Sequence, residues 1–253
     1  MKYLGTLALA IWAVLSAAAY ANQPLVTDDT FTQGPGRYQL EVEGETSRDR
    51  QNGGPTAEET GVTMKFTYGA TDPLDLFVTV PYFRVSEDRT HEGLADVSLG
   101  AKWRFFERGA NSLGLKPEIA FATGEEQHGL GGDATTYSLT FLVTRGVPLL
   151  VLLFNLGYDY RDFHGREERD AERRSLWRVS TGGWLNVAER WRLVADLGIE
   201  RNSERGGSSD PAFALAGIVY SPNKDLDFDL GYKHAINDTE TDRTILLGVT
   251  WRF

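Results

Sequence analysis

Charged side chains recur at alternate positions in several stretches of the chain. Glu41, Glu43 and Glu45 follow one another in this way, and so do Asp227 and Asp229. Alternate residues of a β-strand project from the same face, so each stretch is expected to form one charged face. Such rows can create a field across a pore and select solutes, or they can pair with opposite charges on neighbouring strands. Both interpretations stay open for any single residue.

The expected charged faces together hold acids and bases in similar abundance. We predict that they face the interior of the fold and line a candidate solute path. The members are Glu41, Glu43, Glu45, Lys65, Asp96, Lys102, Arg104, Lys116, Glu118, Asp159, Arg161, Arg178, Arg192, Asp196, Glu200, Asp227, Asp229, Lys233 and Arg252.

Catalytic and metal-binding patterns are missing from the sequence. The chain has no cysteine, which excludes disulfides, thiolate metal sites and cysteine nucleophiles. His91, His128 and His164 fall in expected loops, and His234 lies near a strand end without an obvious serine partner, since Ser180 is two strands or more away. No G-x-S-x-G, H-E-x-x-H or P-loop pattern occurs. We therefore expect no enzyme, no catalytic residue, no cofactor and no metal site.

One acidic, glycine-rich segment is a candidate calcium loop. Residues 124–133 read GEEQHGLGGD, but they lack the fixed ligand spacing that a calcium loop needs. A polar outer loop is the preferred interpretation.

Long strands are the elements that would position the charged faces. From Gly36 onward the chain is a series of stretches with period-two alternation. About 12 are expected, at 36–48, 59–69, 74–86, 94–106, 113–123, 134–145, 148–161, 174–186, 191–203, 211–220, 226–236 and 243–253. Strands of soluble proteins most often have about 5–6 residues, whereas a tilted membrane-spanning strand needs about 9–11. Their length favours strands that cross a membrane.

The faces opposite the charges are apolar and end in aromatic residues. In the last stretch, Ile245, Leu247, Val249, Trp251 and Phe253 share one face. A soluble sandwich would bury such a face in a core, whereas a membrane barrel turns it to lipid and places aromatics at the interfaces. We favour the barrel. The stretch at 148–161 is apolar on both faces before Asn155, and the stretch at 211–220 has an ambiguous face, so the register of both stays open.

Short and long connections alternate strictly along the chain. Turns such as 107–111 and 221–225 are short, whereas segments such as 162–173 and 237–242 are longer and polar. This asymmetry is typical of outer-membrane barrels, which have short periplasmic turns and longer extracellular loops. We predict an all-β protein, a transmembrane antiparallel up-and-down β-barrel over residues 36–253.

The N-terminus has the features of an export signal. Residues 1–21 contain Lys2, an apolar core of about 15 residues and a small-x-small end, which predicts cleavage before Asn22. The core is shorter than the ~20 residues of a membrane anchor. Residues 22–35 are polar and precede the first strand, so they form either a periplasmic segment or a small plug carrying Asp28 and Asp29. The two alternatives stay open.

The expected location is the bacterial outer membrane, and its lipid is the first expected partner. The net charge of −10 disfavours nucleic acid. The terminal Phe253 is similar to the signal that outer-membrane barrels present to the barrel-assembly machinery. The sequence does not give the oligomeric state.

Several motifs carry a family resemblance. They are PLVTDDT at 24–30, QGPG at 33–36, GLADVSLG at 93–100 and ATG at 122–124. The chain resembles a family of bacterial outer-membrane proteins that is named for the meta-pathway of phenol degradation and often described as transporters. The family more often has proline at the position of Ala122. The resemblance implies a barrel and supports a transport role.

A barrel of this size leaves a narrow interior. With ~4.8 Å between strands and a tilt of ~40°, about 12 strands give a backbone radius of roughly 12 Å. We expect a channel for small organic solutes, with aromatic or hydrophobic compounds as candidates, that diffuse passively through the charged lumen. The alternatives are a structural or interaction barrel with a plugged lumen and, less favoured, a lipid-modifying enzyme.

Overall fold

The structure is a computed structural model that describes residues 23–50, 56–86, 90–125, 130–207 and 209–253. The predicted signal segment, the cleavage point before Asn22 and His128 lie outside the described residues. The elements are β1 (Tyr38–Arg50), β2 (Thr56–Thr71), β3 (Leu74–Ser86), β4 (Thr90–Leu94), β5 (Ser98–Arg108), β6 (Asn111–Ala120), β7 (Ala134–Val147), β8 (Leu150–Phe163), α1 (Glu167–Ala171), β9 (Ser175–Ala188), β10 (Trp191–Glu200), β11 (Ala212–Asn223), β12 (Leu226–Ala235) and β13 (Arg243–Arg252).

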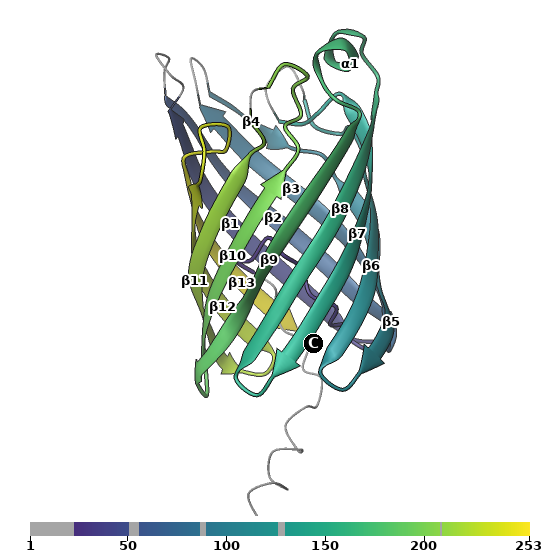
Figure 1. Ribbon diagram of the computed structural model, residues 1–253, viewed down its shortest axis with the longest axis vertical. Coiled ribbons are helices and arrows are strands. Elements are labelled where there is room, and N and C mark those ends of the chain that lie inside the picture. Colours follow the sequence, from purple (N-terminus) through teal and green to yellow (C-terminus); the bar gives the residue numbers. More distant parts are fainter. Residues whose placement is uncertain (1–22, 51–55, 87–89, 126–129, 208) are drawn as a thin grey trace, which may run out of the picture.

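These strands form one closed antiparallel sheet, drawn in Figure 1 as a tilted cylinder. Strands that follow each other along the chain pair side by side, and β1 pairs with β13 from Gln39↔Arg252 to Arg48↔Arg243. The pairing of β2 with β3 closes the sheet on itself, as spanning strands require in lipid. The predicted up-and-down barrel is confirmed.

The wall has twelve strands among the described residues, because β4 and β5 both pair with β3 and act as one interrupted strand. The sequence predicted a continuous strand over 94–106, but pairing stops between Leu94 and Ser98. The carboxylate of Asp96 accepts hydrogen bonds there from the backbone of Thr123, Gly124 and Gly132 at 3.1, 3.0 and 2.9 Å. The carboxylate thus ties a loop to the interruption in place of regular strand pairing.

The two ends of the barrel differ. Tight turns join β2–β3, β5–β6, β7–β8, β9–β10 and β11–β12 at one end, which we call the short-turn end. The longer connections and α1 lie at the other, the long-loop end, at the top of Figure 1. The C-terminus lies at the short-turn end, where Tyr38 N donates to Phe253 O at 2.8 Å and the two rings stack at 5.7 Å.

Alternation of side chains separates an outer apolar face from an inner face. On β13, Ile245, Leu247 and Val249 are exposed outward, whereas Thr244, Leu246 and Thr250 are buried. A continuous exposed apolar band suits contact with lipid tails. On β8, whose register the sequence left open, Leu152 and Leu156 face outward and Leu153 faces inward with 2% exposure. Among the described residues, no helix has the length and apolar character needed to cross a membrane.

Candidate functional site

The N-terminal segment, residues 24–33, lies inside the barrel (Figure 1). Its first anchor is Asp196 on β10. The Asp196 carboxylate accepts hydrogen bonds from Val26 N at 2.8 Å, from Thr27 N at 2.7 Å and from Thr27 Oγ1 at 2.5 Å. A carboxylate that accepts three bonds from one short segment fixes the position of that segment on the wall.

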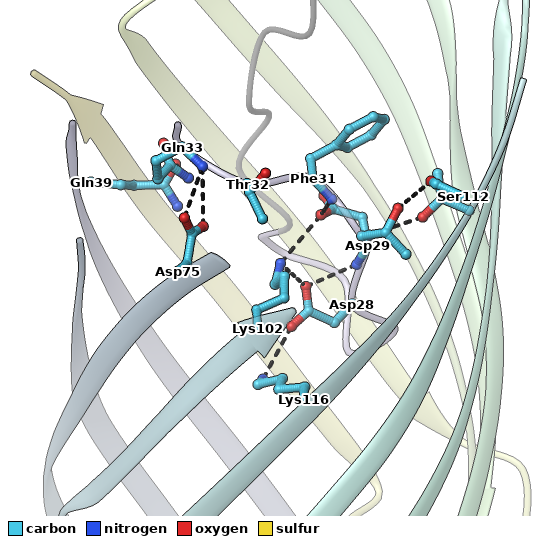
Figure 2. Close-up of polar contacts among 12 residues, drawn as sticks. Asp28, Asp29, Phe31, Thr32, Gln33, Gln39, Asp75, Lys102, Ser112 and Lys116 are labelled. Carbon is cyan, nitrogen blue, oxygen red and sulfur yellow. Dashed lines mark hydrogen bonds and ion pairs between the residues drawn. The ribbon is translucent and has the colours of Figure 1, made fainter. Parts of the chain in front are cut away.

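The second anchor is a cluster of opposite charges between the segment and β5 and β6. Lys102 Nζ lies 2.8 Å from Asp28 Oδ1 and 3.3 Å from Asp29 Oδ1, and Lys116 Nζ lies 3.1 Å from Asp28 Oδ2. Figure 2 shows the two lysines approaching Asp28 from the wall. Burial alone would raise the pKa of Asp28, but the ammonium groups of Lys102, Lys116 and Lys65 hold it below its ordinary value. Asp28 is therefore a carboxylate bound between cations.

Asp29 differs from its neighbour. Burial raises the pKa of Asp29 above its ordinary value, with Lys102 opposing this and the charge of Asp28 adding to it. Asp29 Oδ1 also accepts a hydrogen bond of 2.8 Å from Phe31 N. Asp29 therefore shapes the turn of the segment as well as contacting Lys102.

The far end of the segment is bound by neutral groups and one carboxylate. Thr30 N donates to Thr144 Oγ1 on β7 at 3.0 Å, and the hydroxyls of Thr30 and Ser112 are in hydrogen-bond contact. Gln33 N donates to both oxygens of Asp75 on β3 at 3.1 Å. The Asp196 anchor is on β10 and Asp75 is on β3, on the opposite side of the closed sheet, so the segment crosses the lumen.

An apolar wall lines another part of the interior. Leu25 of the segment belongs to a buried cluster with Val151, Leu153, Trp184, Val194, Phe213, Leu215, Val219 and Leu246. Phe31 packs against this cluster, with its ring centroid 6.3 Å from that of Trp184. The sequence did not predict this surface. Its signal was the apolar character of both faces in the stretches at 148–161 and 211–220.

Several predicted lumen residues pair with each other. The distances are 3.3 Å for Lys65–Glu41, 3.8 Å for Lys116–Glu118, 3.1 Å for Arg178–Asp159, 3.0 Å for Arg192–Asp227 and 2.7 Å for Arg252–Asp227. Asp227 therefore joins two guanidinium groups from β10 and β13. The interpretation as structural pairs applies to these residues.

Other members of the predicted set lie elsewhere. Arg104 pairs with Glu107 at 3.2 Å near the short-turn end, and Lys233 pairs with Glu240 at 3.1 Å. Arg161 contacts Glu172 beyond α1. The side chains of Glu43, Glu45, Glu200 and Asp229 have no hydrogen bond or ion pair among the described residues.

The geometry gives no support to a Ser–His pair. His234 lies on the outer face of β12, where it is exposed and its Nδ1 lies 3.0 Å from Asp242 O. Ser180 lies on β9, on the inner face with Gly182 and Trp184, and β9 does not pair with β12. Within the described part of the chain, no group of three acidic or histidine residues could hold a metal ion.

Comparison with protein families identifies the chain. The model of the family described as "Putative MetA-pathway of phenol degradation" matches residues 21–253. The chain belongs to this family. A comparison with curated proteins finds no match.

Solved outer-membrane barrels share the fold of this family member. An outer membrane channel from Pseudomonas putida F1 is similar with a TM-score of 0.72 and 14% identity, over 89% of this chain and 98% of the channel. The KdgM porin, in complex with disordered oligogalacturonate, gives 0.56 and 8%, over 85% of this chain and 99% of the porin. The translocator domain of the autotransporter NalP from Neisseria meningitidis gives 0.52 and 17%, over 87% and 89%. These likenesses show that the chain has the fold of an outer-membrane β-barrel.

Proposed function

We propose that this protein is an outer-membrane channel for small aromatic or hydrophobic organic solutes, and that residues 24–33 close its lumen. The observation that carries the proposal is the position of the segment between two unlike walls. One wall binds Asp28 through Lys102 and Lys116, and the other packs against Leu25 and Phe31. Displacing the segment would open a passage with one charged side and one apolar side.

The apolar wall supports the choice of solute. A lumen lined only by charges suits ions and sugars. Trp184, Phe213 and Leu215 instead offer an apolar surface, and transfer of an aromatic ring from water to such a surface is favourable in free energy. The family is described by a phenol-degradation pathway, which agrees with such a solute. Passage would be passive diffusion through the opened lumen.

The many anchors of the segment favour a second candidate, a barrel with a permanently closed lumen. Asp196, Lys102, Thr144 and Asp75 all bind it. A closed barrel would have a structural or interaction role. The two candidates differ in whether the segment leaves its place.

A reversible cross-link separates these candidates. The hydroxyls of Thr30 and Ser112 are in contact and the chain has no cysteine, so the double variant Thr30→Cys with Ser112→Cys places one thiol pair between segment and wall. We expect aromatic-solute flux into proteoliposomes to fall on oxidation and to recover on reduction, with each single variant insensitive. Equal flux in both redox states would exclude movement of the segment. Absence of channel events in planar bilayers, with unchanged uptake in a deletion strain, would favour the closed barrel.

A further inference from the structure

A buried carboxylate on the inner face of β12 has no partner in contact. Asp229 is 6% exposed, and neither carboxylate oxygen has a hydrogen bond among the described residues. Asp227, two positions earlier, has two guanidinium groups within 3.0 Å. Leaving a buried polar group unpaired costs free energy, and more when the group is charged. No described side chain binds the Asp229 carboxylate, so a bound cationic group would stabilise it.

A second acid lies opposite Asp229 across one residue. Gly248 of β13 is in register with Glu43 of β1 on one side and with Asp229 of β12 on the other. A side-chain carbon on Gly248 would collide with the Asp229 carboxylate, so this carboxylate lies over the glycine. Glu43 has no hydrogen bond or ion pair among the described residues. Because Gly248 has no side chain, the space over it is open to the carboxylates of its two register partners, Glu43 and Asp229.

A buried hydroxyl lies two residues further along β13. Thr250, the next inward residue of β13, is fully buried, and its hydroxyl has no hydrogen-bond partner among the described residues. Carboxylate and hydroxyl oxygens accept hydrogen bonds, so their complement is a cationic donor. The described side chains do not form a three-acid cluster able to hold a metal ion, which disfavours a chelated divalent cation. An ammonium group matches both the charge and the acceptors.

We propose that Glu43 and Asp229 form a binding site for an ammonium group inside the barrel. The chain itself is one source of that group. Pro24 lies against the inner face of β12, because a side-chain carbon on Gly231 would be 2.7 Å from Pro24 Cβ, and Gly231 is the next inward residue after Asp229. Cleavage before Asn22 would free an α-ammonium group two residues before Pro24, and two residues reach up to ~7 Å.

An amine-bearing solute is the other source. It would meet the same acids on its way through the lumen, and this source rests on the proposed channel function. Occupation by the chain's own amine does not need transport. The two sources are therefore separable by experiment.

The first measurement concerns the α-amine. The mature protein is isolated from outer membranes, its α-amine is dimethylated with a ¹³C label, and its pKa is measured by NMR. We expect the pKa to lie at least about one unit above the ordinary 7.7–8.0, which is about a tenfold preference for the charged form. Asp229→Asn and Glu43→Gln should return it toward the ordinary value, whereas Glu107→Gln, the same charge change at an exposed residue, should leave it raised.

The second measurement concerns the solute. Methylammonium chloride is titrated into the folded protein and binding is followed by NMR line broadening. If the solute is the source, binding saturates in the wild type and is lost in Asp229→Asn and in Gly248→Ala, which keeps both charges but fills the space beside the carboxylate. Sodium at equal concentration controls for ionic strength.

Each result of these two measurements either supports the ammonium site or overturns it. A raised α-amine pKa, or saturable methylammonium binding, supports the site when the effect is lost in Asp229→Asn or in Glu43→Gln. An ordinary α-amine pKa together with no methylammonium binding overturns it, and so does either effect persisting in both variants. Each variant is first checked for folding by heat-modifiable migration in electrophoresis. A protein that binds the amine but gives no channel events would refute the proposed function and leave this site standing.

Discussion

The ammonium group of Lys102 donates a 2.8 Å hydrogen bond to Asp28 Oδ1, across 74 positions of the sequence. This bond joins the N-terminal segment to the barrel wall. Both side chains are about nine-tenths buried, with exposed fractions of 11% and 10%. An ion pair at this depth is weakly screened by salt, so it holds the segment at physiological ionic strength.

Lys102→Met should therefore loosen the segment. Leaving a buried charge wholly uncompensated costs about 3–5 kcal/mol, and the cost here is part of that because Lys116 still contacts Asp28. Moving the segment out of the lumen rehydrates the Asp28 carboxylate, which avoids part of that cost and favours the displaced segment. We expect a higher open probability in planar bilayers than in the wild type. Arg48→Met is the control, since the Arg48–Glu58 pair is about half exposed and should contribute no more than ~1 kcal/mol.

The two aspartates predict an unusual response to acid. The pKa of Asp28 is lowered, so its contribution to seating is present above the ordinary pKa of aspartate and is lost only when pH falls through the lower folded value. The pKa of Asp29 is raised by burial, so protonation of Asp29 favours the seated segment, and this contribution is lost as pH rises through its folded value. Acidification to about pH 4 should keep the channel closed.

The measurement is open probability against pH in planar bilayers. Asp29→Asn should flatten the profile, because asparagine is neutral throughout and mimics the protonated acid. Asp28→Asn should raise open probability at neutral pH, since it removes the charge that Lys102 and Lys116 bind. An opening of the wild type on mild acidification would contradict this account.

The apolar wall predicts selectivity. Leu153 faces the lumen in the buried cluster, and Leu156 lies on the outer face of the same strand with 49% exposure. Leu153→Thr should lower the flux of an aromatic solute relative to a polar solute of equal size. Losing the burial of one or two methyl groups is worth about 1 kcal/mol, or roughly fivefold. Leu156→Thr should leave the flux ratio unchanged in the same proteoliposome assay.

The barrel itself was predictable because strand alternation is a local property. The sequence around Ile245, Leu247 and Val249 repeats every two residues, and lipid on one side makes that repeat obligatory. Residues 148–161 were ambiguous because the inner face is apolar too. Only the closed barrel reveals that Leu153 packs with Trp184 and Val194, which come from other strands.

The contacts of the N-terminal segment could not be predicted from the sequence. Asp28 and Asp29 were candidates for a plug, but their partners Lys102 and Lys116 are far along the chain and are fixed only by strand register. Thr27, Thr30 and Ser112 carried no signal, since a hydroxyl has many ordinary uses. Asp96 illustrates the reverse case, because its alternating position predicted a lumen residue, whereas its bonds are to a loop.

Asp227 predicts the largest loss of stability among the wall residues. Its Oδ2 lies 3.0 Å from Arg192 Nη2 and 2.7 Å from Arg252 Nη2, and the two arginine side chains are only 5% and 10% exposed. Asp227→Asn removes the carboxylate that both buried guanidinium groups bind. We expect a loss of about 3–5 kcal/mol in the free energy of unfolding, measured by urea titration in detergent micelles. Glu58→Gln, which breaks the exposed pair with Arg48, should cost less than about 1 kcal/mol. Equal effects of the two substitutions would mean that the Asp227 pairs do not hold β10, β12 and β13 together.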